Sequence, residues 1–137
     1  MKRIATATWN GSLKEGQGSF SVSSGAIKGL KFSFRTRFES EPGTNPEELI
    51  AAAHASCFSM ALSAQLGERG IAPEAVETTC TINFENLALT QSLLHTTVKA
   101  KGADLAKVEE AAAAAKAGCP ISKVLKLDTV LELTVLV

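Results

Sequence analysis

The sequence predicts an α+β fold in which an antiparallel sheet packs on one long central helix. Two observations carry this prediction. Short segments in which apolar and polar residues alternate are typical of half-buried strands, and they occur on both sides of a single long apolar segment, Leu49–Leu66. No shift towards linker-like composition interrupts the 137 residues. We therefore expect one domain over residues 1–137, with the element order βββ-α-ββ-α-β.

Three strands are expected before the central helix. Residues 2–9 alternate up to Trp9, and the Asn10–Gly11 pair that follows is typical of a tight turn. A second strand fits residues 18–23. The third, over residues 31–38, places aromatic rings on one face and polar side chains on the other. The aromatic face holds Phe32, Phe34 and Phe38, and the polar face holds Lys31, Ser33, Arg35 and Arg37.

The central helix has recognisable ends. Asn45 suits the N-cap, Pro46 the first helical position and Glu48 the third, which together predict a capping box. The helix is expected to run to Arg69, where Gly70 stops it. Its apolar stretch is about as long as a membrane span, but it contains a histidine and several serines. We therefore interpret it as the buried centre of the domain.

The second half of the chain predicts a pair of strands, a helix and a last strand. The alternation over residues 76–85 puts Cys80 on the core face, where its expected role is that of a small hydrophobe. In the partner strand, over residues 93–101, His95 points outward and receives no catalytic role. The inward residues of that strand are Leu94, Val98 and Ala100, and one face of the last strand holds Leu131, Leu133, Val135 and Val137.

Composition excludes several classes of function. Lys and Arg number 14, as do Asp and Glu, so the chain has no basic field to gather nucleic acid or an anionic membrane. Aromatic residues make up only 5%, which argues against a base-stacking surface. Polar Thr6 and Thr8 stand where a secretory signal needs an apolar run, so we expect a cytoplasmic protein. The three cysteines form no CxxC pair, which argues against a disulfide scaffold and a zinc site.

Cys119 has a context that could activate a thiol. A helix capped by Asp104 is expected to end at Gly118, immediately before it. If Pro120 opens another helical turn, Cys119 lies at the N-terminus of that turn, where a thiolate is favoured. Filling a corner where the chain turns is an equally open alternative.

Cys57 lies inside the central helix, where burial makes a thiol inert unless a cation is near. His54 lies one turn earlier and could hydrogen-bond to this sulfur, but a core histidine with satisfied hydrogen bonds is the favoured interpretation. Taken alone, Arg37 could be a solvated charge, and Glu48 could serve only the helix cap.

Two segments resemble the OsmC/Ohr family, the osmotically inducible and organic hydroperoxide resistance proteins. They are TRFESEPGTNPEELIAAAHASCFSMAL at residues 36–62 and AKAGCPISKVLK at residues 115–126. The order of elements is similar over essentially the whole chain. Within the family, AAHASCFSMAL at residues 52–62 is more similar to the OsmC branch than to the Ohr branch.

The resemblance implies a thiol peroxidase of oxidative or osmotic stress defence, acting on organic hydroperoxides, with hydrogen peroxide as a further candidate substrate. The family cysteine that matches Cys57 attacks the peroxide, and the one that matches Cys119 resolves the product as a disulfide, which an external dithiol must reduce. An arginine and a glutamate complete the family's site and match Arg37 and Glu48. The resemblance also implies an intertwined homodimer with sites at the subunit interface, and no metal or bound cofactor. Cys80 lies outside the motif and is expected to be a bystander.

Helix geometry predicts that the Glu48 and Cys57 of one site come from different chains. The two residues are nine positions apart, which on a straight helix separates them by about 13.5 Å along the axis. They also point to roughly opposite faces. Arg37, which precedes the helix, could reach either site.

Two other classes of function fit the predicted fold. A long helix against an antiparallel sheet also describes hot-dog acyl thioesterases, whose activity would survive alkylation of every thiol. A non-catalytic redox-sensing or ligand-binding module would oxidise once and would not turn over in excess dithiol. The paired cysteine motifs favour the peroxidase over both.

Overall fold

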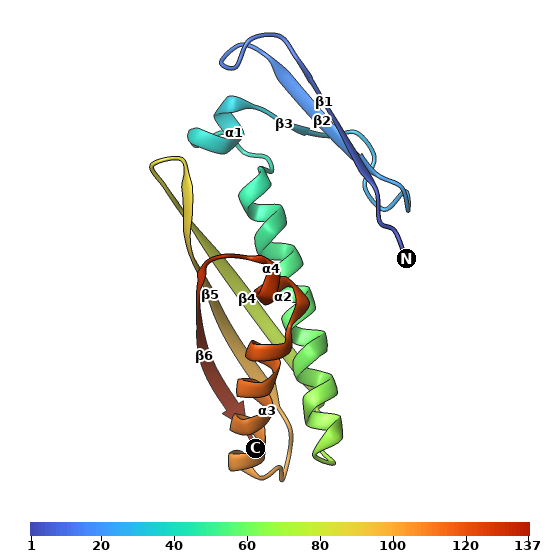
Figure 1. Cartoon of the computed structure of the whole chain (residues 1–137), viewed down its shortest axis with the longest axis vertical. Coiled ribbons are helices and arrows are strands. Elements are labelled where there is room, and N and C mark those ends of the chain that lie inside the picture. Colours follow the sequence, from blue (N-terminus) through green and yellow to red (C-terminus); the bar gives the residue numbers. More distant parts are fainter. The chain divides into compact units, whose positions relative to one another are not determined.

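Two compact units make up the chain, residues 1–49 and residues 50–137. The computed structural model describes every residue from Met1 to Val137 (Figure 1). Each unit has its own three-stranded sheet, and helices complete both, so the predicted α+β class is confirmed. That a single domain covers residues 1–137 stays a prediction.

The first unit contains an antiparallel sheet of order β1-β2-β3. Its strands are β1 (Ala5–Asn10), β2 (Gln17–Val22) and β3 (Leu30–Phe32). Gly18 lies between Trp9 and Phe32 in the register. A Cβ atom at this position would lie 2.5 Å from the Phe32 ring and 2.8 Å from the Trp9 ring. The missing side chain therefore lets the two rings approach to 5.6 Å between centroids across the sheet.

The tight turn expected at Asn10–Gly11 is wrong. Asn10 is the last residue of β1 and pairs with Gln17, so residues 11–16 form a longer loop. This loop has its own hydrogen bonds: the Trp9 ring N–H donates to the Gly11 carbonyl at 3.1 Å, and the backbone N–H at position 16 donates to the carbonyl at position 12 at 2.8 Å. These bonds stabilise the wider loop in place of a two-residue turn.

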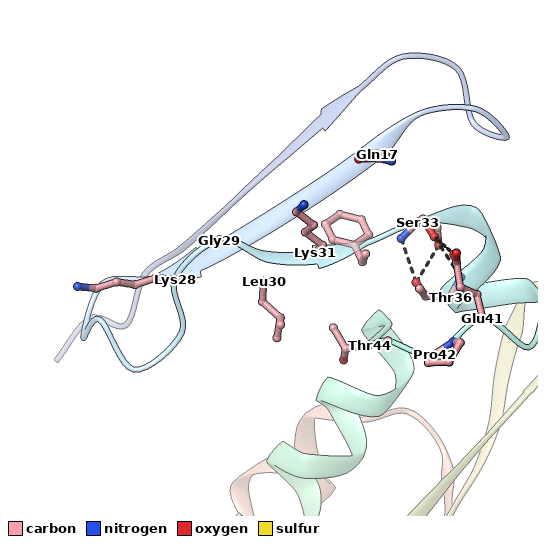
Figure 2. A pocket seen from close by; sticks show the side chains of 12 residues that line it. Gln17, Lys28, Gly29, Leu30, Lys31, Ser33, Thr36, Glu41, Pro42 and Thr44 are labelled. Atoms are coloured by element: carbon pink, nitrogen blue, oxygen red, sulfur yellow. Dashed lines mark hydrogen bonds between the residues drawn. The ribbon is translucent and has the colours of Figure 1, made fainter.

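The third strand, expected over residues 31–38, is only partly correct. Strand β3 ends at Phe32, and a short helix, α1 (Phe34–Phe38), follows it. Ser33 and Thr36 start this helix with a capping box, in which each side-chain oxygen accepts a hydrogen bond from the other residue's backbone N–H (Figure 2).

Arg37 lies on helix α1, whereas the sequence predicts it on the polar face of a strand. Phe34 and Phe38 are four residues apart, a spacing that brings side chains to one face in a strand and in a helix alike. Their rings lie with centroids 4.8 Å apart. The alternation therefore could not distinguish the two structures, and the capping box favours the helix.

Helix α2 (Pro46–Glu68) begins where the sequence predicts and ends within one residue of the predicted end. The Asn45 side-chain oxygen accepts a hydrogen bond from the Glu48 N–H at 2.8 Å, which confirms the N-cap. At the other end, Gly70 adopts a φ of 74°. The Ile71 N–H donates to a carbonyl of the last turn at 2.9 Å, as in a Schellman motif.

One side of α2 is buried. Its buried residues recur at every fourth position, as His54, Phe58, Leu62 and Leu66. By length and composition α2 could cross a membrane, a test that the core helix of a soluble protein also passes. The three apolar members of the stripe belong to the hydrophobic core, which supports the interpretation as a central core helix.

The second unit contains a sheet of order β4-β5-β6. Its further elements are β4 (Ala75–Glu85), β5 (Ala88–Lys99), α3 (Leu105–Gly118), α4 (Pro120–Val124) and β6 (Asp128–Leu136). Strands β4 and β5 form a hairpin whose turn residues, Asn86 and Leu87, both have positive φ. Strand β6 pairs in parallel with β5, so the antiparallel prediction is wrong for this strand. Helices α3 and α4 supply the long crossover that parallel pairing needs.

The core lies between the second sheet and the helices α2 and α3 (Figure 1). Asp104 caps α3 as predicted, because its carboxylate accepts a hydrogen bond from the Ala106 N–H at 3.0 Å. The faces of β4 and β5 also agree with the prediction. Cys80 packs against the core, His95 is exposed, and Leu94, Val98 and Ala100 are buried.

Candidate active site

Two of the three cysteines face each other in the second unit. Cys57 lies in the middle of α2 and Cys119 lies between α3 and α4, and their sulfur atoms are 3.3 Å apart. Both are free thiols. Cys119 is fully buried, whereas Cys57 is partly exposed. The sulfurs need to approach by only about 1 Å to reach the bond length of a disulfide.

The groups around this pair shift the pKa values of the two thiols in opposite directions. Burial raises the pKa of Cys57, and the Cys119 sulfur raises it further, while the backbone N–H of Ile121 acts against both. Burial also acts to raise the pKa of Cys119. The N–H and hydroxyl of Ser122, the Cys57 thiol and the Ile121 N–H together outweigh that burial and hold the pKa of Cys119 below its usual value. Of the two thiols, Cys119 is therefore the one that these groups favour as the thiolate. Cys57 needs a nearby cation to become the thiolate.

Helix α4 explains the environment of Cys119. Pro120 begins this helix directly after Cys119, so the additional helical turn that the sequence left open is present. The Cys119 side chain makes no capping hydrogen bond, yet the polar groups of the following turn lower its pKa. A thiolate at this position is thus stabilised by backbone and hydroxyl hydrogens.

His54 is fully buried, and both of its ring nitrogens are hydrogen-bonded. Nδ1 lies 2.7 Å from Ser92 Oγ on β5, and Nε2 lies 2.6 Å from Ser122 Oγ on α4. Burial lowers the pKa of His54, so the ring is neutral at pH 7. The favoured interpretation of a core histidine with satisfied hydrogen bonds is confirmed. Sequence reasoning missed both serines, which lie far from His54 along the chain.

Cys80 is hydrogen-bonded to a serine and not to either cysteine of the thiol pair. Its sulfur is 3.3 Å from the Ser92 hydroxyl. Burial raises the pKa of Cys80, and the Ser92 hydrogen bond only partly opposes this. Cys80 is therefore a protonated thiol, as expected of a bystander. No three His, Cys, Asp or Glu side chains gather anywhere in the chain in a group that could hold a metal ion.

In the first unit, Arg37 forms an ion pair with Glu47. Arg37 Nη2 lies 2.7 Å from Glu47 Oε1, and Arg37 Nε lies 3.2 Å from the same oxygen. The carboxylate in this ion pair is that of Glu47, the neighbour of the predicted Glu48, and a role of Glu48 in the site stays a prediction. Neighbouring residues on a helix point about 100° apart. The sequence therefore could not decide between adjacent glutamates without the rotation of α2 about its axis.

An apolar cavity adjoins Arg37 in the same unit. It has a volume of about 270 Å³, and its walls include the side chains of Trp9, Leu13, Phe34 and Phe38. A larger cavity of about 600 Å³, shown in Figure 2, is lined by neither Arg37 nor a cysteine. The smaller cavity combines apolar walls with one guanidinium, which suits a ligand with an alkyl or aryl body and a polar end.

The chain is similar to a known family over most of its length. A family model described as OsmC-like protein matches residues 38–134. Peroxiredoxin OsmC of Escherichia coli K12 is 45% identical over 130 residues, which cover 92% of this chain and 91% of that protein. The solved structure of the organic hydroperoxide resistance protein OhrB of Bacillus subtilis has a TM-score of 0.68 and 25% identity, over 96% of this chain and 98% of that chain. An OsmC like protein from Mycoplasma pneumoniae has a TM-score of 0.77 at 14% identity, over 100% of this chain and 99% of that chain, a likeness of fold alone.

Proposed function

We propose that this chain, which belongs to the OsmC-like protein family, reduces organic hydroperoxides at Cys57 and then joins Cys57 to Cys119. Membership follows from the family match over residues 38–134 and from 45% identity to Peroxiredoxin OsmC, and the chain is a cysteine-based peroxidase. One observation carries the choice of residues. The two sulfurs lie 3.3 Å apart, and only Cys57 is open to solvent.

The proposed reaction has three steps. The Cys57 thiolate attacks one peroxide oxygen, the O–O bond breaks, and the alcohol leaves while Cys57 becomes a sulfenic acid. Cys119 then attacks the Cys57 sulfur, a disulfide forms, and the sulfenic oxygen leaves as water. An external dithiol reduces the disulfide by thiol–disulfide exchange. The nearness of Cys119 favours this second step over further oxidation of Cys57.

Arg37 and Glu47 have complementary roles in this proposal. The guanidinium lowers the pKa of the Cys57 thiol and donates hydrogen bonds to the departing oxygen as negative charge develops on it. Glu47 holds the guanidinium through contacts to both Nε and Nη2. The apolar cavity beside Arg37 binds the organic part of the hydroperoxide.

We propose further that each site combines Cys57 of one chain with Arg37 and Glu47 of another, in an intertwined homodimer. Glu47 and Cys57 lie on the same continuous helix, α2, ten positions apart. That spacing corresponds to about 15 Å along the helix axis, too far for their side chains to meet around one guanidinium. A second copy of the chain supplies the missing neighbour.

The solvent-exposed side of α2 suits contact with such a copy. Five of its exposed residues lie at alternating intervals of three and four, namely Ala53, Ser56, Met60, Ser63 and Gly67. Met60 is 75% exposed. Small side chains at this spacing let two helices approach closely, and a methionine adapts its shape to the opposing surface.

Turnover with a purified sample tests the function. The protein should consume an organic hydroperoxide in the presence of a dithiol such as dithiothreitol, and more slowly with a monothiol. Brief oxidation without reductant should join Cys57 to Cys119 and leave Cys80 free, as read by peptide mapping under non-reducing conditions. A major disulfide that contains Cys80, or activity that survives alkylation of all thiols, would contradict the proposal.

Mixing two variants, one impaired and one inactive, tests the shared site. Glu47→Gln and Cys57→Ser subunits, unfolded together and refolded, should form heterodimers in which one site has both residues intact. Each heterodimer should then show up to about half the activity of a normal dimer. Mixed dimers that form but stay inactive would rule out the sharing of one site between chains.

In the cell, we propose that the protein acts in the cytoplasm during oxidative or osmotic stress. Cytoplasmic thiol reductants keep cysteines reduced there, as the free Cys57 and Cys119 require between turnovers.

A further inference from the structure

A line of hydrogen bonds connects Cys80 to Cys119 through the second unit. Cys80 Sγ lies 3.3 Å from Ser92 Oγ, and Ser92 Oγ lies 2.7 Å from His54 Nδ1. On the other side of the ring, His54 Nε2 lies 2.6 Å from Ser122 Oγ. Ser122 is three residues after Cys119, in the helical turn that follows it, and its hydroxyl is one of the groups that lower the pKa of Cys119. Four side chains from β4, β5, α2 and α4 thus lead to one sulfur of the reactive pair.

The hydrogen bonds can run in two directions, and the one that follows has the Ser122 hydroxyl donating to Cys119. Burial keeps Cys80 a thiol beside Ser92, and either of the two can donate in their contact. The Ser92 hydroxyl then donates to His54 Nδ1, which leaves the ring proton on Nε2. This N–H donates to Ser122, so the Ser122 hydroxyl hydrogen is left to point at Cys119. In this arrangement each serine hydroxyl donates once and accepts once, and the neutral ring does the same.

We propose that His54 is a positioning residue for Cys119, which it serves by holding the Ser122 hydroxyl with its hydrogen directed at the Cys119 sulfur. The proposal rests on the peroxidase function above, because it concerns the closing and opening of the Cys57–Cys119 disulfide. A serine hydroxyl on its own rotates among several wells. The contact of 2.6 Å to a fully buried ring restricts it to one.

The hydrogen bond acts wherever negative charge develops on Cys119. In closing, the Cys119 sulfur attacks the Cys57 sulfenic acid. The S–S bond forms and the S–O bond breaks, and the oxygen leaves as water with the proton that Cys119 gives up. In opening, an external thiolate attacks the accessible Cys57 sulfur, and Cys119 departs as a thiolate that accepts the Ser122 hydrogen bond. In the first step Cys57 attacks the peroxide, and Cys119 forms and breaks no covalent bond.

Two variants and one control separate these steps. His54→Phe removes the bond to Ser122, and Ser122→Ala removes the hydroxyl itself. Ser59→Ala is the control, because Ser59 also lies on α2 and bonds across to the sheet, at 2.8 Å to Thr78. Rapid mixing with a hydroperoxide measures the alcohol released in the first turnover, and quenched samples measure how fast the sulfenic acid becomes a disulfide. Both variants should close the disulfide about tenfold more slowly, with alcohol release within about twofold of the unmodified protein.

A titration that needs no peroxide provides a readout that a purely structural role would not change. In a background that carries Cys57→Ser and Cys80→Ser, Cys119 is the remaining thiol, and the second substitution keeps a hydroxyl donor at the start of the line. The pKa of Cys119, followed by thiolate absorbance, should rise when Ser122→Ala or His54→Phe is added and stay unchanged with Ser59→Ala. His54 is the titratable group left in the core near Cys119, and the lysines of the flanking helices, Lys116 and Lys123, are exposed.

Each outcome decides the question. Slow closure with normal alcohol release, together with a raised pKa of Cys119, supports the positioning role. A normal rate of disulfide closure in folded Ser122→Ala protein overturns the positioning role. An equal loss of rate in alcohol release and in disulfide closure overturns it as well. If His54→Phe does not fold, Ser122→Ala alone provides the test. If the unmodified protein consumes no hydroperoxide, the proposed function fails instead, and the titration of Cys119 still decides the role of His54.

Discussion

The two units of this chain hold their reactive groups in opposite settings. In the first unit, the side chain of Arg37 is 37% exposed and that of its partner Glu47 is 12% exposed. In the second unit, Cys119 and His54 are fully buried. The buried core side chains all lie beyond Ile50, whereas strand β1 of the first unit is exposed along its whole length.

This difference follows from what each group needs. Two thiols that must form a bond have to be held within about 1 Å of bonding distance, and a packed core does this at the expense of raising the pKa of Cys57. A guanidinium needs only one well-oriented carboxylate to present its fork of donors. In the proposed reaction, Arg37 of a second chain supplies the cation that activates Cys57. Each of the following variants changes a residue in one of the two units.

The largest effect is expected at the thiols. Cys57→Ser should abolish peroxide consumption, because the attacking atom is lost. Cys119→Ser should consume about one peroxide per site and then stall as a sulfenic or more highly oxidised acid. Mass spectrometry of the oxidised variants, together with peroxide counting, measures both. An equal loss of the first turnover in the two variants would reverse or refute the proposed order of attack.

The next effect distinguishes Glu47 from Glu48. Glu47→Gln should lower kcat/KM by at least about tenfold, since misplacing a guanidinium by an ångström is costly to catalysis. Glu48→Gln is the matched control, with a neighbouring carboxylate on the same helix, and should stay within about twofold. Steady-state kinetics with one hydroperoxide measures both. A larger loss at Glu48 would restore the assignment that the sequence alone predicted.

A smaller effect concerns the stability of the second unit in acid. The usual pKa of histidine, 6.5, applies to the unfolded chain, and burial lowers the pKa of His54 in the fold. Below about pH 6.5 the unfolded state therefore binds more protons than the folded state, and the free energy of unfolding falls as pH falls. The slope can reach about 1.4 kcal/mol per pH unit.

Denaturant unfolding between pH 7.5 and 5.5 measures this slope. His54→Phe should flatten it, because the variant has no buried imidazole to protonate, and exposed His95→Gln serves as the control for losing an imidazole. An unchanged slope in His54→Phe would show that other groups cause the acid sensitivity.

The smallest effect is expected at the start of helix α1. Ser33→Ala removes the cap that accepts the Thr36 N–H, and such a loss costs about 1 kcal/mol. Because Arg37 lies on this helix, kcat/KM should fall a few-fold while the spacing of the thiols is unaffected. Disulfide closure after a single oxidation should therefore match that of the exposed control variant Ser24→Ala. A slower closure would mean that the cap acts on more than the guanidinium.

Features that depend on neighbouring residues could be predicted from the sequence. The N-caps at Asn45 and Asp104 follow from side chains that bond within three residues, and the helix end at Gly70 follows from backbone freedom at one residue. The core face of Cys80 follows from the alternation over residues 77–82 of β4. The early end of β3 at Phe32 could not be predicted from the sequence. Phe34 and Phe38 are four residues apart, and this spacing puts two side chains on one face in a strand and in a helix alike.

The sequence by itself determined the α+β class and the family, since these depend on periodicity, capping and two distinctive segments. Only the tertiary structure decided what depends on rotation and distance. The rotation of α2 selects Glu47 over its neighbour, and the crossover through α3 and α4 makes β6 parallel. The packing of the second unit places Ser92 and Ser122 on the two nitrogens of His54. The physical reason is the same in each case, because contacts between residues distant in the chain leave no local pattern to read.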